Sequence, residues 1–213
     1  EIINENKHIK FISPFLRDKK HQVDRFYIYR YRGNCAKELR RKNIFLLGDA
    51  AHQMPPFAGQ GLSSGLRDAS NLCWKIAYVI NNQFNNEILD TYQIERIDEV
   101  KKSIDSSIAL GKLIDSLSVA FKKNTPLEEA IPPEAREQAY GKKTLTEQSI
   151  SKGLFSSLVR DDNIGKLVPM TFFSNETENV SIDDLLDSRF GVISSKDPKD
   201  SLNESVLNSY KII

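Results

Sequence analysis

Cysteine and histidine are scarce in this chain of 213 residues. The two cysteines, Cys35 and Cys73, are isolated and form neither a Cys-x-x-Cys pair nor a metal-ligand spacing. The three histidines, His8, His21 and His52, lie far apart in the sequence and predict no metal site. We therefore expect a reduced, cytoplasmic protein without a metal centre.

An excess of charge of either sign is also missing. The 30 basic residues are matched by 29 acidic ones, which gives no electrostatic case for binding nucleic acid or an anionic membrane. No apolar run approaches the roughly 20 residues that span a bilayer. The first residues, Glu1 to Asn4, lack the basic and apolar regions of a signal peptide. We therefore expect neither nucleic acid nor a membrane as a partner.

The pattern of elements predicts a mixed, helix-rich α/β fold, in one domain or two small ones. Residues 23–32 are rich in aromatic and β-branched side chains and predict a strand that ends near Gly33. A short helix is expected over residues 34–41. The apolar run 44–47, stopped by Gly48, predicts a buried strand.

Two long helices are the clearest prediction. The prolines at 55 and 56 predict a loop or broken helix over residues 49–59, because proline removes a donor and fixes φ. Apolar steps of three and four residues then predict a helix from Leu62 to Ile80 and a second one from about Glu87 to about Phe121. The apolar positions are Leu62, Leu66, Ala69, Cys73, Ile76, Ala77 and Ile80 in the first, and Ile97, Val100, Ile104, Ile108 and Gly111 in the second.

The last third of the chain has a weaker pattern. Residues 134–160 are polar and predict a loop with short helices. After Gly165 the α/β texture returns: Ser181, with Asp184 three residues later, is typical of a helix N-cap, and residues 190–193 predict a strand.

The chemistry is concentrated between Gly48 and Gly61. Asp49 follows the apolar run and can accept hydrogen bonds from ribityl or ribose hydroxyls, while Pro56 helps to form a rigid wall with few donors. The glycines at 59 and 61 open a helix, where free N–H groups and the positive end of the helix dipole favour the negative charge that a reduced flavin carries. Together these features predict a site for FAD.

The glycines do not fit a Rossmann fingerprint. That fingerprint needs a tight turn directly after a strand and a second strand that ends in an acid about 20 residues later. Here about ten residues separate the strand from Gly59, and one unbroken helix follows. Close packing of the helix against a strand or a ligand would explain Gly65. His52 is expected to be a structural hydrogen-bonding residue, and Asp68 either binds loop N–H groups or is solvated.

These residues carry a family resemblance. Gly48-Asp49-Ala50-Ala51-His52, Pro55-Pro56, Gly59-Gln60-Gly61, Asp68-Ala69, Asn71-Leu72 and Trp74-Lys75 resemble the second FAD-binding motif of the class A flavoprotein aromatic hydroxylases, in particular the 3-(3-hydroxyphenyl)propionate hydroxylase type. Tyr29-Arg30-Tyr31, Tyr92 and Glu95-Arg96 fit the same family, and the resemblance is specific over residues 27–110.

The resemblance implies an FAD-dependent monooxygenase that uses NAD(P)H and O2 to hydroxylate a phenolic ring. By motif position, Asp49 would bind the ribityl chain and Pro56 would lie beside the flavin, with no residue assigned firmly as catalytic. Gly59, Gln60, Gly61 and Leu62 would line the pyrimidine end of the ring through backbone N–H groups. Phe26, Ile28 and Tyr29 are candidates for one wall of the substrate pocket, although core packing is the more ordinary role for at least two of them.

The resemblance also implies four segments. Residues 1–33 would end the substrate-binding sheet, 34–125 would be part of a GR2-type FAD-binding domain, 126–164 a linker, and 165–213 the start of a thioredoxin-like domain. The strand–Gly-x-Gly-x-x-Gly–helix unit that holds the ADP half of FAD in that family is absent from the sequence. We therefore expect weak or no flavin binding by the chain alone. Three hypotheses follow: a portion of a hydroxylase, one chain of a split flavoenzyme completed by a partner chain, or a non-catalytic helical interaction module.

Overall fold

The computed structural model describes residues 12–16, 19, 22, 24, 25, 27, 29–126, 129, 131, 150, 152–154, 164–166, 168, 172–174, 179–187, 190–192 and 211–212. The chain divides into two compact units, Glu1–Gly165 and Lys166–Ile213. The predicted polar loop over residues 134–160 lies almost wholly outside the described residues. Among the residues that are described, no helix combines the length and the apolar character needed to cross a membrane.

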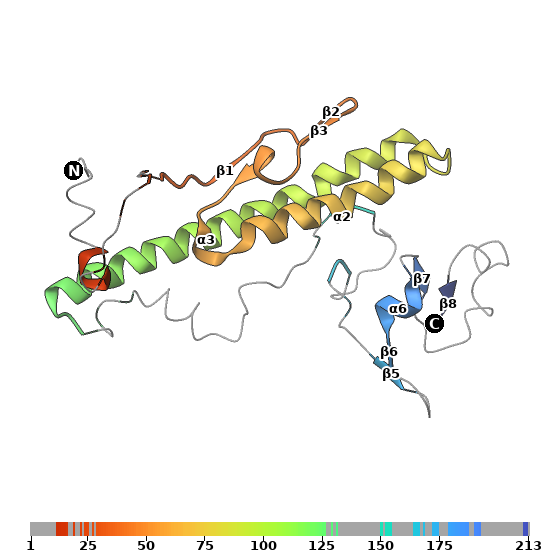
Figure 1. Cartoon of the computed structure of the whole chain (residues 1–213). Coiled ribbons are helices and arrows are strands. Elements are labelled where there is room, and N and C mark those ends of the chain that lie inside the picture. The colour runs from red at the N-terminus through yellow and green to blue at the C-terminus, as the bar shows by residue number, and fades with distance from the viewer. Residues whose placement is uncertain are drawn as a thin grey trace. The chain divides into compact units, whose positions relative to one another are not determined.

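Two long helices dominate the first unit, as the periodicity predicts. Helix α2 spans Gln60–Ile80 and helix α3 spans Thr91–Lys123. They run antiparallel and side by side in Figure 1, joined by a short 3-10 helix, η3, at Asn86–Asp90. Helix α3 ends at Asn124, whose left-handed φ of 52° stops the helix just before Pro126.

Short paired segments lie beside this hairpin of helices. Strand β1 (Asn34–Cys35) pairs antiparallel with β4 (His52–Gln53), and β2 (Arg40–Arg41) pairs antiparallel with β3 (Ile44–Phe45). Two 3-10 turns, η1 at Gly48–Ala50 and η2 at Pro56–Ala58, interrupt the chain between β3 and α2. The predicted loop or broken helix over residues 49–59 is confirmed by these two 3-10 turns, but the span also contains the unpredicted short strand β4.

Two predicted strands and one predicted short helix need correction. The described residues between 24 and 33 form no strand, and residues 34–41 form β1, a bend and β2 in place of a helix. The predicted buried strand 44–47 is a two-residue arm of a hairpin, and its first side chain, Ile44, is 69% exposed. Strands of two residues are too short to show the alternation from which a strand is predicted.

Among the described residues of the first unit, one cluster of buried apolar side chains lies between the strands and the helices. It consists of Leu39, Ala51, Leu72, Leu89 and Tyr92. The Tyr92 hydroxyl donates to the Leu46 carbonyl over 2.7 Å, and the Gln93 side-chain oxygen accepts from the Leu39 N–H over 2.7 Å. Helix α3 therefore fixes the segment between β1 and η1 by packing and by hydrogen bonds.

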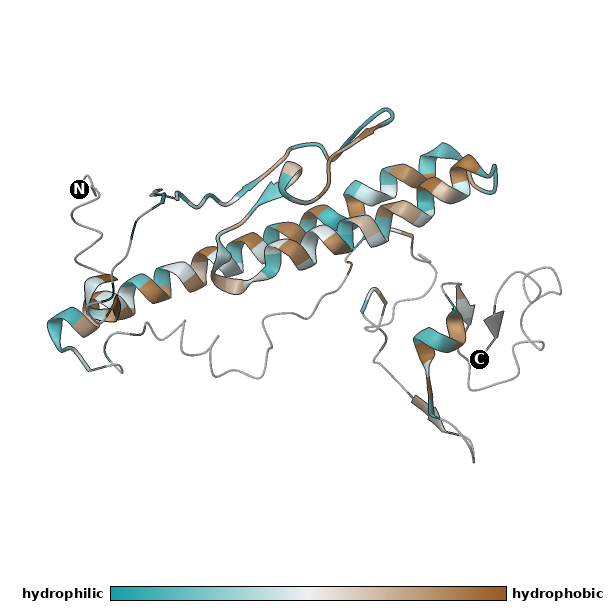
Figure 2. Cartoon of the chain, in the orientation of Figure 1, coloured by the Kyte–Doolittle hydropathy of each residue, from teal (hydrophilic) through white to brown (hydrophobic). Residues whose placement is uncertain are grey.

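Helix α2 presents an unexpected face to this core. Its buried residues are Ser64, Asp68, Leu72 and Lys75, so three of the four are polar. The apolar residues that predict the helix lie largely on the other side, where Leu62 and Ile80 are exposed. Figure 2 shows polar and apolar positions interspersed around both helices.

The second unit contains small pieces of regular structure. Strands β5 (Phe172–Ser174) and β6 (Asn179–Ser181) are antiparallel, and the short helix α6 (Ile182–Leu186) follows. The Ser181 hydroxyl accepts from the Asp184 N–H over 3.1 Å, which confirms the predicted N-cap. Strand β7 (Gly191–Val192) pairs parallel with β8 (Lys211–Ile212), so the strand predicted near residues 190–193 is also present.

Candidate functional site

The residues predicted to bind a cofactor lie on η1, η2 and the first turn of α2. Asp49 is exposed in η1, and Pro56 is exposed at the start of η2. Gly59 is the N-cap of α2 and has a left-handed φ of 62°. Gln60 and Gly61 begin the helix, and the following side chain, Leu62, is 79% exposed.

The N-terminus of α2 is open. No side chain caps it, so its first N–H groups have no intrahelical or capping partner. A Cβ built on Gly59 or on Gly61 would meet no atom within 4 Å, which leaves space for a ligand to approach the backbone. With the helix dipole, this end favours an anionic or hydrogen-bond-accepting group.

A contact between two glycines places Asp49 relative to α2. A Cβ on Gly65 would lie 3.3 Å from the Gly48 Cα, so backbone approaches backbone here. Gly48 has a left-handed φ of 54°, which favours glycine. The close packing that was expected to explain Gly65 is therefore packing against the turn that carries Asp49.

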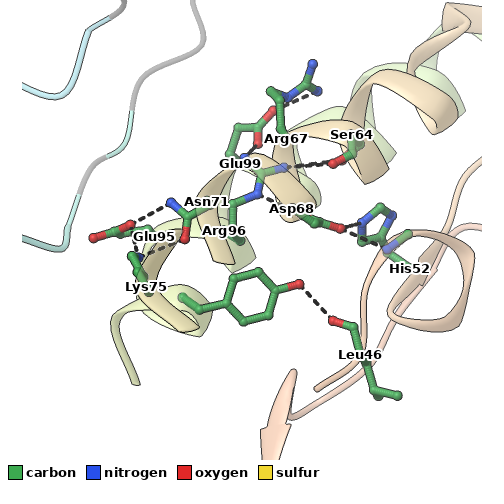
Figure 3. Close-up of polar contacts among 12 residues, drawn as sticks. Leu46, His52, Ser64, Arg67, Asp68, Asn71, Lys75, Glu95, Arg96 and Glu99 are labelled. Atoms are coloured by element: carbon green, nitrogen blue, oxygen red, sulfur yellow. Dashed lines mark hydrogen bonds and ion pairs between the residues drawn. The ribbon is translucent and has the colours of Figure 1, made fainter. Parts of the chain in front are cut away.

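Asp68 fixes the same turn by hydrogen bonds. Its Oδ2 accepts from the Gly48 N–H over 3.0 Å and lies 2.7 Å from the His52 Nε2, while its Oδ1 accepts from the Arg96 Nε over 2.8 Å (Figure 3). Asp68 is fully buried. Of the two roles considered for Asp68, the structure shows binding of a loop N–H, and it confirms His52 as a structural hydrogen-bonding residue.

The charge of Asp68 is stabilised by these partners. Burial by itself would raise the pKa of the carboxyl, but the hydrogen bonds from His52, Arg96 and the Gly48 N–H outweigh burial and lower the pKa. Asp68 is therefore ionised near neutral pH and serves as the acceptor that joins η1, β4 and α3.

The ionic network continues between the two helices (Figure 3). Arg96 also binds Glu99, and Arg67 lies 2.9 Å from Glu99. Nearer the other end of α2, the Lys75 ammonium donates to Glu95 over 2.6 Å and to Asn71 over 2.8 Å. Burial lowers the pKa of Lys75, and Glu95 opposes that shift. Charged pairs, more than apolar packing, thus define how α2 faces α3.

A cavity of about 340 Å³ lies beside Asp49. Its lining comes from two parts of the chain, the segment that precedes β1 and the loop that carries the predicted site. The Tyr29 and Tyr31 rings are 5.1 Å apart, and Tyr31 meets Phe57 of η2 edge-on at 5.6 Å. The lining residues are Tyr29, Arg30, Tyr31, Arg32, Asp49, Gln53 and Met54.

Sequence reasoning missed part of this arrangement. Tyr29 was a candidate for the substrate wall and does line the cavity, while Phe26 and Ile28 lie outside the described residues. Arg30 and Arg32 were not proposed as site residues. Their spacing of two, which places both on one side of an extended segment, is a signal that could have identified them.

Comparisons with known proteins agree with this geometry. Residues 15–107 match the family model of the FAD binding domain. This part of the chain is similar to that family. The chain is also 44% identical over 92 residues to the 3-(3-hydroxy-phenyl)propionate/3-hydroxycinnamic acid hydroxylase of Mycolicibacterium vanbaalenii, an alignment that covers 43% of this chain and 16% of the relative. The enzyme of that name from Klebsiella pneumoniae is 44% identical over 106 residues, or 49% of this chain and 19% of the relative.

Solved structures show the same fold. CabE, an aromatic hydroxylase from angucycline biosynthesis, superposes with a TM-score of 0.67 at 18% identity, over 100% of this chain and 45% of that chain. The flavin-dependent monooxygenase PieE, solved with FAD and substrate, gives a TM-score of 0.64 at 20% identity, over 86% of this chain and 40% of that one. The chain therefore has the helix-rich fold of part of an FAD-binding aromatic hydroxylase, and it spans less than a fifth of the length of these curated relatives.

Proposed function

We propose that this chain supplies the flavin-ring and ribityl part of the FAD site in a monooxygenase that hydroxylates phenolic aromatic compounds with NAD(P)H and O2. The observation that carries the proposal is the uncapped N-terminus of α2, with open space at Gly59 and Gly61, close to an exposed Asp49 on an anchored turn. The family match and the names of the relatives support the same activity.

The residues present fit FAD. Asp49 is exposed, lines the cavity and can accept hydrogen bonds from ribityl hydroxyls. The N–H groups of Gln60, Gly61 and Leu62, with Gly59 before them, would bind the pyrimidine end of the ring and stabilise its negative charge. Pro56, exposed on η2, would lie beside the ring without offering a donor. Bound FAD supplies the redox chemistry, and the residues of this chain bind and orient it.

Other parts of the proposal concern the larger organisation. We also propose that the chain contains part of a GR2-type FAD-binding domain, followed by the start of a thioredoxin-like domain. The boundaries of the four predicted segments are part of the same proposal. Either a longer protein or a partner chain would provide the residues that hold the ADP half of FAD. The substrate would be a small phenolic compound.

A riboflavin titration tests the flavin site. Riboflavin lacks the adenine and the phosphates, so it probes only the half of the site that is present here. We expect weak binding to the ¹⁵N-labelled chain, with amide shifts within residues 48–62, and about a tenfold loss of affinity in Asp49→Ala, since the variant loses hydrogen bonds to a charged acceptor.

The matched control is Asp105→Ala, which removes an exposed carboxylate from α3, away from the site. Unchanged riboflavin binding in Asp49→Ala, or shifts that avoid residues 48–62, would contradict the proposed site.

A further inference from the structure

A short segment near the end of the first unit lies against helix α3. Residues 152–154, which we call the strap, form a series of bends, and the side chains of Lys152 and Leu154 are exposed. The Leu154 N–H donates to the Glu95 Oε1 over 3.1 Å, across 59 positions of sequence. The strap is therefore held on α3 by its backbone and not by burial of its side chains.

Gly153 permits this contact in two ways. A Cβ on Gly153 would lie 2.3 Å from the Glu95 Cγ and 2.5 Å from its Oε1, which is closer than side-chain carbons approach other atoms in folded proteins. Its φ of 148° is also one that L side chains rarely adopt. Because Glu95 is only 6% exposed, it has little room to yield. A larger residue at position 153 would therefore move the strap off Glu95.

Glu95 joins the strap to both long helices. From its place in α3, its Oε2 accepts from the Lys75 ammonium and from the Asn71 amide of α2, each over 2.6 Å (Figure 3). Its Oε1 accepts from the Leu154 N–H. Lys75 is fully buried, so these polar groups depend on one another for their hydrogen bonds. Without the strap, Oε1 would have no partner among the described residues.

This cluster adjoins the one that holds the turn of the candidate site. Arg96 follows Glu95 in α3 and binds Asp68, which lies two turns before Lys75 on the buried face of α2. The Gly48 N–H donates to the same Asp68 carboxylate. Two adjacent residues of α3 therefore hold α2 at two points. One point carries the turn of the candidate site, and the other carries the strap.

We propose that the strap is a conformational device that fixes the α2–α3 pair, and that its docking on Glu95 strengthens the hold of Asp68 on the turn that carries Asp49. With the strap docked, both oxygens of Glu95 are bound, and α2 and α3 are held in register. With the strap released, Oε1 opens to water and the neighbouring contact between Arg96 and Asp68 loosens, because the members of a buried polar network support one another. The inference does not depend on flavin binding.

The test uses the full chain, labelled with ¹⁵N, and follows hydrogen exchange of the Leu154 and Gly48 amides by NMR. In the parent chain, the Leu154 amide should exchange about tenfold more slowly than in the unfolded chain, as expected for a hydrogen bond to a charged acceptor. Gly153→Ala should abolish this protection, because the added Cβ would clash with Glu95. The Gly48 amide should then exchange about threefold faster than in the parent chain.

Leu154→Pro tests the same contact by a second route, since proline has no N–H to donate to Glu95. Gly48 exchange should rise in this variant as it does in Gly153→Ala. Both substitutions lie in an exposed segment outside the helices, so the circular dichroism of the parent chain should be retained. The matched control is Lys152→Ala, which changes an exposed side chain of the strap and keeps the Leu154 N–H. It should leave the exchange of both amides unchanged.

Three results would overturn the inference: an unprotected Leu154 amide in the parent chain, unchanged Gly48 exchange in both strap variants, or an equal increase in Lys152→Ala. Exchange that rises throughout α2 and α3 as much as at Gly48 would overturn it as well. Such a result would mean that the variants loosen the whole unit and not the contact between Asp68 and the turn.

Discussion

Asp68 is the residue on which the candidate site depends most. Its two carboxylate oxygens join η1, the turn that carries Asp49, to β4 and to α3. Sequence reasoning identified a role in binding loop N–H groups as one of two alternatives. It could not identify Arg96 as a partner, because that pair forms only when α2 and α3 lie side by side.

Replacing Asp68 by Asn should destabilise the chain. The variant keeps the size of the side chain but removes the charge that Arg96 and His52 face in a buried setting. A broken buried ion pair leaves an uncompensated charge, so we expect the free energy of unfolding to fall by about 3 kcal/mol. Urea denaturation measures this change. The control, Asp105→Asn on the exposed side of α3, should stay within about 0.5 kcal/mol of the parent chain.

The same carboxylate predicts an acid dependence of stability. The pKa of Asp68 is lower in the folded chain than its ordinary value, so the unfolded chain binds the proton more readily. The stabilisation that the Asp68 charge adds to the free energy of unfolding is complete above a pH of about 4, the ordinary pKa range of Asp. This stabilisation is lost as the pH falls through the lower pKa of the folded state. Unfolding free energies between pH 7 and pH 2.5 should therefore fall more steeply for the parent chain than for Asp68→Asn. Parallel curves would show that Asp68 does not have the lowered pKa.

Helix α2 shows what the periodicity of a sequence determines and what it leaves open. Steps of three and four residues predicted the helix to within two residues at its start. The side that is buried was not predictable from hydropathy, because it carries Asp68 and Lys75, whose charges are satisfied by Arg96 and Glu95 from α3. The burial of these side chains follows from pairing between elements, which no single-helix pattern contains.

The strands were predicted less well for a related reason. Residues 23–32 have strand-like composition, but the described residues between 24 and 33 pair with no neighbour. The pairs that do form are only two residues long and depend on turns, such as the one at Lys42 with its φ of 55°. The loop with its prolines was predicted correctly, since proline acts locally.

Two glycines in α2 give a matched test of how this helix meets the turn of Asp49. Alanine usually stabilises a helix by about 1 kcal/mol relative to glycine. At Gly61 nothing lies within 4 Å of the added Cβ, so Gly61→Ala should show much of this gain. At Gly65 the Cβ would lie 3.3 Å from the Gly48 backbone, so Gly65→Ala should show no gain or a loss. Urea denaturation of both variants checks the difference, and equal stabilisation would mean that the glycine contact is not tight.

At the scale of the whole molecule, the chain corresponds to a part of its relatives. The match to CabE covers 45% of the CabE chain, and the matches to the curated hydroxylases cover less than a fifth of their length. The predicted contacts to the flavin ring and ribityl chain all come from residues 49–62, which lie inside the matched family segment 15–107. The proposed site would thus hold one half of the cofactor.

This division predicts how the chain should discriminate between flavins. Because the sequence contains no strand–Gly-x-Gly-x-x-Gly–helix unit, the ADP half of FAD should add little to the affinity. FAD and riboflavin should therefore bind this chain with dissociation constants within about threefold of each other, a difference of under 1 kcal/mol. Fluorescence quenching of each flavin measures the two constants, and ADP added in excess should not displace riboflavin. An FAD affinity a hundredfold above that of riboflavin would contradict this expectation, because it would require an ADP site within these 213 residues.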